Sequence, residues 1–192
     1  MLATVVLVAT PAEAVRTSWR GVITFDKNQQ HQFDSRVVWR LLKRTGNGPW
    51  KLVEKKAWRA GGGLPGRGGQ DSCAKNRGWL PNGTYHLQLH RDYHGNLIKG
   101  RAFRLDDKRC PSGTQRNQLF LHTEQGAGSR QCRNQPGDQA CRWEWPRIND
   151  YKSYGCIKMA PGDLRELVNV YHQHFGGGVR YSKAQVVLRV IN

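Results

Sequence analysis

Acidic residues are scarce in this chain of 192 residues. Only 14 Asp and Glu stand against 31 Lys and Arg, so the formal net charge is +17. Such an excess says nothing about the fold but favours anionic partners: nucleic acid, anionic lipid or a cell-wall polymer. A disordered basic tail is excluded, because 38% of the residues are hydrophobic and seven are tryptophan. The length fits one domain with one core.

Long apolar runs are also absent. The run that comes nearest spans residues 2–9, far short of the roughly 20 apolar residues that cross a bilayer, so no transmembrane span is expected. Ala-Glu-Ala at 12–14 fits a small-residue cleavage site after Ala14, although no Lys or Arg precedes Arg16. We therefore expect residues 1–14 to be a remnant of a secretory signal and residues 15–192 to form a single exported domain. A buried N-terminal strand is the alternative.

The cysteines are few and odd in number, five in all. Cysteines of exported proteins usually pair. Cys132 and Cys141 flank a polar stretch that reads as a turn, and Cys73 and Cys110 both lie in loop-like sequence. We therefore prefer the bridges Cys132–Cys141 and Cys73–Cys110, which leave Cys156 as a free thiol. Other pairings of five cysteines remain open.

The pattern of residues predicts a mainly β protein. A glycine-rich loop is expected over residues 59–78, and one amphipathic helix begins at Pro161 and stops at the glycines of residues 176–178. No internal repeat is present. We expect a β-sandwich or barrel-like core with one or two helices. Segments rich in β-branched and aromatic residues predict strands at residues 18–26, 36–44, 50–58, 84–90, 101–107, 118–123 and 184–191.

The surroundings of Cys156 favour a reactive thiol over a merely buried one. The helix begins about five residues later, and the partial positive charge of a helix N-terminus favours a thiolate. Gly155 leaves room for a substrate carbonyl, and the backbone N–H groups of residues 155 and 156 could stabilise an oxyanion. Lys158 adds a positive charge nearby.

A cysteine nucleophile needs a base, and seven histidines compete for that role. His122 is the preferred candidate, because it ends an apolar strand and so lies at the mouth of a sheet. His172 and His174 come late on the helix, and His86 and His90 lie on the polar face of an alternating strand. A purely structural histidine at 122 is the alternative.

These residues resemble a known family. Ser-Tyr-Gly-Cys-Ile-Lys at 153–158, followed by Asp-Leu-Arg-Glu-Leu-Val at 163–168, is similar to the signature of the L,D-transpeptidase catalytic domain, the YkuD-type peptidoglycan enzymes. Leu-Pro-Asn-Gly-Thr-Tyr at 80–85 is similar to a segment that precedes a strand in that family. The resemblance covers residues 79–190. It implies that Cys156 is the nucleophile, that His122 activates it, and that Ser153 and Gly155 are its motif partners.

The sequence departs from the family pattern at three places. Tyr154 replaces a motif histidine, and Lys158 replaces an arginine, which keeps the charge but loses the planar fork that grips a carboxylate. We expect both side chains to contact substrate. The interval from His122 to Ser153 is longer than usual and contains two cysteines. We expect it to form a disulfide-stapled insertion over the active site.

The resemblance implies acyl transfer on peptidoglycan stem peptides, outside the cytoplasm at the cell wall. The thiolate attacks the carbonyl before a D-residue and forms a thioester; an amine then gives a cross-link, whereas water gives L,D-carboxypeptidase activity. No cofactor is implied, and no metal is expected, because the histidines and cysteines lack zinc-type spacing. The net charge suits anionic wall polymers as further partners. No nucleic-acid motif is recognised.

Three alternatives stay open. An NlpC/P60-like thiol endopeptidase would carry its cysteine before its histidine, the reverse of the order here. A secreted basic module that binds wall polymers without catalysis would use the charge and the tryptophans. A secreted antibacterial toxin would use the same catalytic domain against foreign walls. The oligomeric state and the stem-peptide composition are not predicted.

Overall fold

The computed structural model describes residues 16–144, 150–176 and 185–192. The expected signal remnant, residues 1–14, lies outside these ranges. The described chain forms eleven strands, one α-helix and two short 3-10 helices. The helices are α1 (Pro161–Phe175), η1 (Gln32–Asp34) and η2 (Ala127–Ser129). The strands are β1 (Thr17–Asp26), β2 (Ser35–Thr45), β3 (Lys51–Gly62), β4 (Gly83–Tyr85), β5 (Leu87–His94), β6 (Lys99–Leu105), β7 (Lys108–Arg109), β8 (Gln115–Arg116), β9 (Phe120–His122), β10 (Ile157–Met159) and β11 (Val186–Ile191).

Nine of these strands form one sheet in the order β4-β11-β1-β2-β3-β10-β9-β6-β5, and β7 pairs with β8. The two edge strands, β4 and β5, follow each other in the chain, and β11 also contacts β5. The sheet therefore curls into a nearly closed, barrel-like form. The expected mainly β fold with a barrel-like core is confirmed. No helix in the described ranges is long and apolar enough to cross a bilayer.

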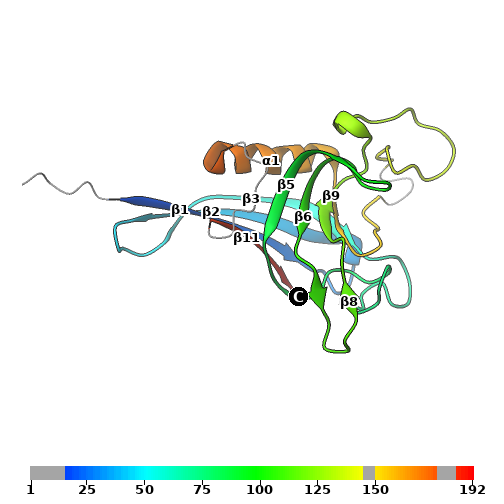
Figure 1. Ribbon diagram of the computed structural model, residues 1–192, viewed down its shortest axis with the longest axis horizontal. Coiled ribbons are helices and arrows are strands. Elements are labelled where there is room, and N and C mark those ends of the chain that lie inside the picture. The colour runs from blue at the N-terminus through cyan, green and yellow to red at the C-terminus, as the bar shows by residue number, and fades with distance from the viewer. Residues whose placement is uncertain (1–15, 145–149, 177–184) are drawn as a thin grey trace, which may run out of the picture.

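The core lies between the concave sheet and helix α1, which runs along one face of it (Figure 1). The ring of Tyr171 on α1 meets Phe103 of β6 edge to face, with centroids 5.6 Å apart. Phe175, on the last turn, meets Trp39 of β2 in the same way at 6.1 Å. Such contacts stabilise by about 1 kcal/mol beyond the area that they bury. The helix thus fastens β2 and β6, which flank the strands that carry the candidate site.

Helix α1 matches its prediction closely. Pro161 occupies the first turn, where its missing N–H costs nothing, and Leu164 and Leu167 are fully buried on the inner face. Gly176 ends the helix with a φ of +74°, a conformation that favours glycine. Its N–H donates to the carbonyl of His172.

The expected loop at residues 59–78 is wrong at its start, because β3 continues to Gly62. Strand β10 pairs with this end of β3, Ile157 opposite Gly62 and Lys158 opposite Gly61. A Cβ on Gly62 would lie 2.8 Å from the carbonyl oxygen of Cys156. The glycines are therefore strand residues that let the chain at Cys156 approach closely.

Two other predicted strands differ from the structure. The predicted strand 84–90 is divided at His86, because Tyr85 pairs with β11 whereas Leu87 pairs with β6. The strand predicted at 118–123 is only Phe120–His122, since Gln118 has a φ of +53° and turns the chain. His122 nevertheless ends this strand, as expected.

Candidate active site

Strands β9 and β10 lie side by side and parallel, and they bring the two main candidate residues together. Leu121 pairs with Ile157, and His122 with Lys158. Cys156 immediately precedes β10 and shares a sheet face with Lys158, because side chains two residues apart point the same way. Paired residues of neighbouring strands also share a face, so His122 lies on that face too. Strand spacing puts the Cα atoms of Cys156 and His122 about 8 Å apart.

Cys156 is the free cysteine, and the other four form the bridges Cys73–Cys110 and Cys132–Cys141, which confirms the preferred pairing. The Cys156 thiol is half-buried. Its S–H donates to the carbonyl of Gln118, with 3.7 Å between sulfur and oxygen, and the backbone N–H of Phe120 bonds the sulfur. The backbone groups of Gln118 and Phe120 thus fix the direction of the thiol.

Burial raises the pKa of the Cys156 thiol to about 11, and the Phe120 N–H, Lys158 and Arg116 oppose this only in part. The expectation that a helix N-terminus stabilises a thiolate is therefore wrong. Extended chain separates Cys156 from Pro161, and five residues at about 3.3 Å each span about 16 Å. The field of a helix end fades within its first turn, so α1 does not reach the sulfur.

His122 is buried, and its ring is held in one tautomer. Its Nδ1 lies 3.0 Å from the carbonyl oxygen of Thr123. A carbonyl only accepts, so Nδ1 carries the proton and Nε2 keeps a free lone pair. Burial, reinforced by the positive charge of Lys158, lowers the pKa of His122 to about 3. The imidazole is therefore neutral and has a nitrogen that can take a proton.

Lys158 is also buried, and it forms an ion pair with Glu124, which follows β9 by two residues. The ammonium group therefore faces a carboxylate of the protein rather than open solvent. Burial outweighs the attraction of Lys158 and raises the pKa of Glu124 to about 7. The predicted substrate contact of Lys158 has no support in this arrangement, which instead places its charge beside His122.

Ser153 shapes the turn that leads into Cys156. Its hydroxyl donates to the carbonyl of Cys156 at 2.5 Å and accepts from the N–H of Gly155 at 3.3 Å. The Gly155 N–H, expected to face an oxyanion, is thus already bonded, by a long hydrogen bond that a substrate oxygen would have to displace. Tyr154, between them, is 66% exposed and free to meet a ligand.

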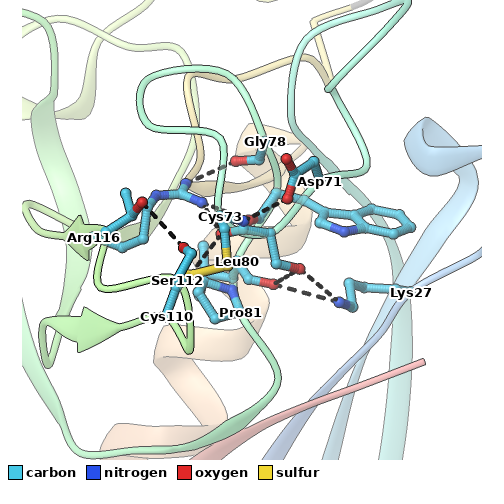
Figure 2. The surroundings of a disulfide bond; sticks show 12 residues. Lys27, Asp71, Cys73, Gly78, Leu80, Pro81, Cys110, Ser112 and Arg116 are labelled. Carbon is cyan, nitrogen blue, oxygen red and sulfur yellow. Dashed lines mark hydrogen bonds between the residues drawn. A yellow bond between two sulfur atoms is a disulfide. The ribbon is translucent and has the colours of Figure 1, made fainter.

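Arg116 of β8 is a site residue that the sequence analysis missed. Its side chain is 2% exposed, and its guanidinium donates to the carbonyls of Ser72, Gly78 and Trp79 (Figure 2). The guanidinium packs against Gly155, and its charge lowers the pKa of the Cys156 thiol. Nothing in the sequence distinguishes Arg116 from the other basic residues.

A separate pocket of about 380 Å³ opens beside the Cys73–Cys110 disulfide. Its wall includes the basic side chains of Lys27, Lys108 and Arg109, and neither Cys156 nor His122 lines it. Lys27 lies over the ring of Trp79 at 4.7 Å, and burial lowers its pKa to about 8. This pocket is therefore distinct from the candidate active site, and we assign it no part in the chemistry.

Residues 123–144, the described part of the connection that follows β9, project beyond the end of the sheet (Figure 1). They carry the predicted disulfide, and the N–H of Cys132 also donates to the carbonyl of Cys141 at 2.9 Å. Gln131 donates to the carbonyl of Glu124, which ties the loop to its own beginning. Because Glu124 pairs with Lys158, the insertion starts directly beside the candidate catalytic residues.

Comparisons with known proteins assign no family. No protein-family description matches the chain, and no curated protein matches it. A solved structure from Bdellovibrio bacteriovorus, titled "Structure of Bdellovibrio bacteriovorus Bd1075", is similar with 16% identity and a TM-score of 0.47. The match covers 94% of this chain and 50% of that one, so this chain spans about half the length of that protein.

Proposed function

We propose that the protein is a cysteine acyltransferase that acts on peptidoglycan stem peptides, as an L,D-transpeptidase or an L,D-carboxypeptidase. One observation carries the proposal: the free thiol of Cys156 shares a sheet face with the neutral imidazole of His122, whose Nε2 is available. The resemblance of residues 153–158 to the family signature supplies the substrate class. Two disulfides support an oxidising, extracytoplasmic environment.

In the first half of the reaction, Cys156 forms a bond to the carbonyl carbon that precedes a D-residue of the stem peptide. His122 Nε2 takes the thiol proton as the sulfur attacks, so no thiolate has to exist beforehand. Both groups rest neutral, since the thiol has a pKa of about 11 and the imidazole a pKa of about 3. Proton transfer between them is therefore unfavourable in the free protein and has to occur in the same step as the sulfur bonds to the carbonyl carbon. The hydrogen bond from Nδ1 to Thr123 holds the ring in place.

The tetrahedral intermediate then collapses, and the carbon–nitrogen bond breaks. The departing D-amino acid takes the proton back from His122, and a thioester to Cys156 remains. In the second half, His122 removes a proton from an amine of another stem, which yields a cross-link, or from water, which yields a shortened stem. Either attack returns the thiol.

The negative oxygen of the intermediate needs a donor. We assign this role to the backbone N–H of Cys156, with the charge of Arg116 close behind Gly155. Tyr154, exposed beside them, is assigned to substrate contact. These assignments leave Lys158 as a residue that acts on His122 and Glu124 rather than on substrate.

Incubation of the intact chain with purified tetrapeptide stems, followed by mass spectrometry, tests the proposal. Loss of the terminal D-residue indicates a carboxypeptidase, and cross-linked dimers indicate a transpeptidase. Cys156→Ser should abolish both, and His122→Gln should slow turnover by about 10²–10⁴-fold, because the base is lost. Unchanged melting temperatures would show that both variants fold. Equal turnover by Cys156→Ser would overturn the proposal.

Two other functions would give different results. A wall-polymer-binding module would sediment with purified peptidoglycan but leave the stems intact. Trp50 is poorly placed to stack on a polymer, because Arg20 and Arg44 both lie over its ring, each 4.8 Å from the centroid. An antibacterial toxin would cleave stems in the same way and would also stop the growth of foreign cells when added from outside.

A further inference from the structure

Four carboxylates converge in the connection between β9 and β10. One oxygen from each lies within 4.8 Å of all the others, and the four residues are Glu124, Asp138, Glu144 and Asp150. Three of these residues are at least nine-tenths buried, and Asp138 is exposed. Glu124 follows β9, Asp138 lies inside the loop that Cys132 and Cys141 close, and the other two lead back towards β10. Residues far apart in sequence thus point at one place.

Glu144 is the member that the protein leaves unsatisfied. The residue is only 7% exposed, and neither of its carboxylate oxygens has a hydrogen-bond partner in the part of the chain that the structure describes. The second oxygen of Glu124, Oε2, is equally buried and without a partner among these residues. Taking a carboxylate out of water without a compensating partner is strongly unfavourable. These oxygen atoms therefore need a bound ligand to offset the cost of their burial.

The charges around the cluster leave room for a divalent cation. Lys158 pairs with Glu124, and Lys152 pairs with Asp138, so two ammonium groups face four carboxylates. Arg142 attracts Glu144 but forms no ion pair within the described residues. The charge of Glu144 is thus left without an ion pair among the described residues.

We propose that Glu124, Asp138, Glu144 and Asp150 form a binding site for a divalent cation, with Ca²⁺ as the preferred ion. All the donors are oxygens, which excludes a zinc site of the cysteine and histidine type. Ca²⁺ accepts 6–8 oxygens at about 2.4 Å, so two ligands of one ion lie at most about 4.8 Å apart, and the cluster meets that limit. Mg²⁺ demands stricter geometry and prefers to keep waters.

The ion would cross-link the insertion to the end of β9. It would join Glu124, two residues after His122, to Asp138 in the disulfide loop and to the return of the chain at Asp150. The site makes no use of Cys156, so it stands independently of the proposed acyl transfer. The expectation of no metal rested on histidine and cysteine spacing, which cannot detect carboxylates spread over residues 124–150.

The test compares melting temperatures of the intact chain, freed of metal with EDTA and then given CaCl₂ or MgCl₂, with disulfides preserved. At 100-fold excess over the dissociation constant, Ca²⁺ should raise the melting temperature by roughly 5–10 °C, and Mg²⁺ by less. Titration calorimetry should give one Ca²⁺ per chain. No rise with Ca²⁺, or a larger rise with Mg²⁺, would overturn the proposal.

Variants distinguish Ca²⁺ binding at this site from non-specific attraction of Ca²⁺ to surface carboxylates. Glu144→Gln keeps the shape of the side chain and removes its charge, so the melting temperature of this variant should no longer rise with Ca²⁺. Without metal, its melting temperature should be at least that of the unaltered chain. Asp138→Asn changes an exposed position, so the variant should fold, and it should bind Ca²⁺ at least tenfold more weakly. The control is Asp107→Asn, another exposed aspartate, which should bind as the unaltered chain does. Equal binding by Asp138→Asn and Asp107→Asn would contradict the site.

Discussion

The guanidinium of Arg116 packs so closely on the backbone of Gly155 that a Cβ there would lie 2.2 Å from Nη2. Gly155 has a φ of +124°, which side-chain-bearing residues rarely adopt. Three backbone carbonyls accept hydrogen bonds from the guanidinium and hold it in place. The residue before Cys156 is thus held between its own turn and the fixed guanidinium, which sets the position of Cys156.

Gly155→Ala should therefore disturb both stability and turnover. The new methyl group meets Arg116 and forces an unfavourable φ, so we expect a loss of about 2–3 kcal/mol in the free energy of unfolding. Denaturant unfolding measures it. Gly162→Ala, in the first turn of α1 with nothing within 4 Å of its Cβ, is the matched control and should be neutral or slightly stabilising. Equal effects of the two substitutions would refute the close packing of Arg116 on Gly155.

Arg116→Lys should destabilise the protein although the charge is kept. A lysine cannot reproduce the planar fork that reaches Ser72, Gly78 and Trp79, so buried carbonyls lose their donors. We expect about 2–3 kcal/mol by chemical unfolding. Arg36→Lys, at an exposed position on β2, should change stability by less than about 0.5 kcal/mol. A similar small effect at Arg116 would show that its three hydrogen bonds contribute little.

Alkylation of the non-reduced protein should label Cys156 alone and slowly at neutral pH. Its thiol pKa of about 11 leaves roughly one molecule in 10⁴ as thiolate at pH 7, and this fraction grows tenfold with each pH unit up to about pH 11. The rate of iodoacetamide labelling, followed by intact mass, should rise with that slope from pH 7 to 10. Cys156→Ser should take up no label. A plateau below pH 9 would mean a thiol that ionises far more readily.

The two disulfides should differ in their contribution to stability. The bridge Cys73–Cys110 spans 37 residues and Cys132–Cys141 spans nine, so the longer loop restricts the unfolded chain more. In the chain-entropy description, replacing the first pair by serines should cost about 4 kcal/mol and replacing the second about 2.6 kcal/mol. Urea unfolding of the two double variants gives the comparison. The reverse order would indicate that the small loop contributes through contacts instead.

The features that the sequence predicts well are those that depend on local pattern. The apolar spacing of Leu164 and Leu167 placed α1 almost to the residue, and the turn-like polar stretch between Cys132 and Cys141 indicated their bridge. Strand pairing over long distances is not visible in local pattern. The extension of β3 through Gly62, for example, exists because β10 arrives from almost a hundred residues further along the chain.

The same limit applies to the candidate site. Cys156 and His122 could be chosen from their neighbours in sequence, but the Cys156 pKa could not, because it depends on burial that only the folded chain creates. The prediction treated the four residues between Cys156 and Pro161 as a short distance, whereas extended chain makes that distance long. Arg116 and Glu124 were missed because their partners come from distant segments.

The parallel pairing of β9 and β10 has a consequence for the connection between them. Neighbouring parallel strands cannot be joined by a tight hairpin, so the chain must leave the sheet after His122 and travel back before it reaches Cys156. The backbone ladder, not the length of that excursion, sets the register of the two residues. A change in the length or sequence of this excursion can therefore leave the relative position of His122 and Cys156 unchanged while altering the surface beside them.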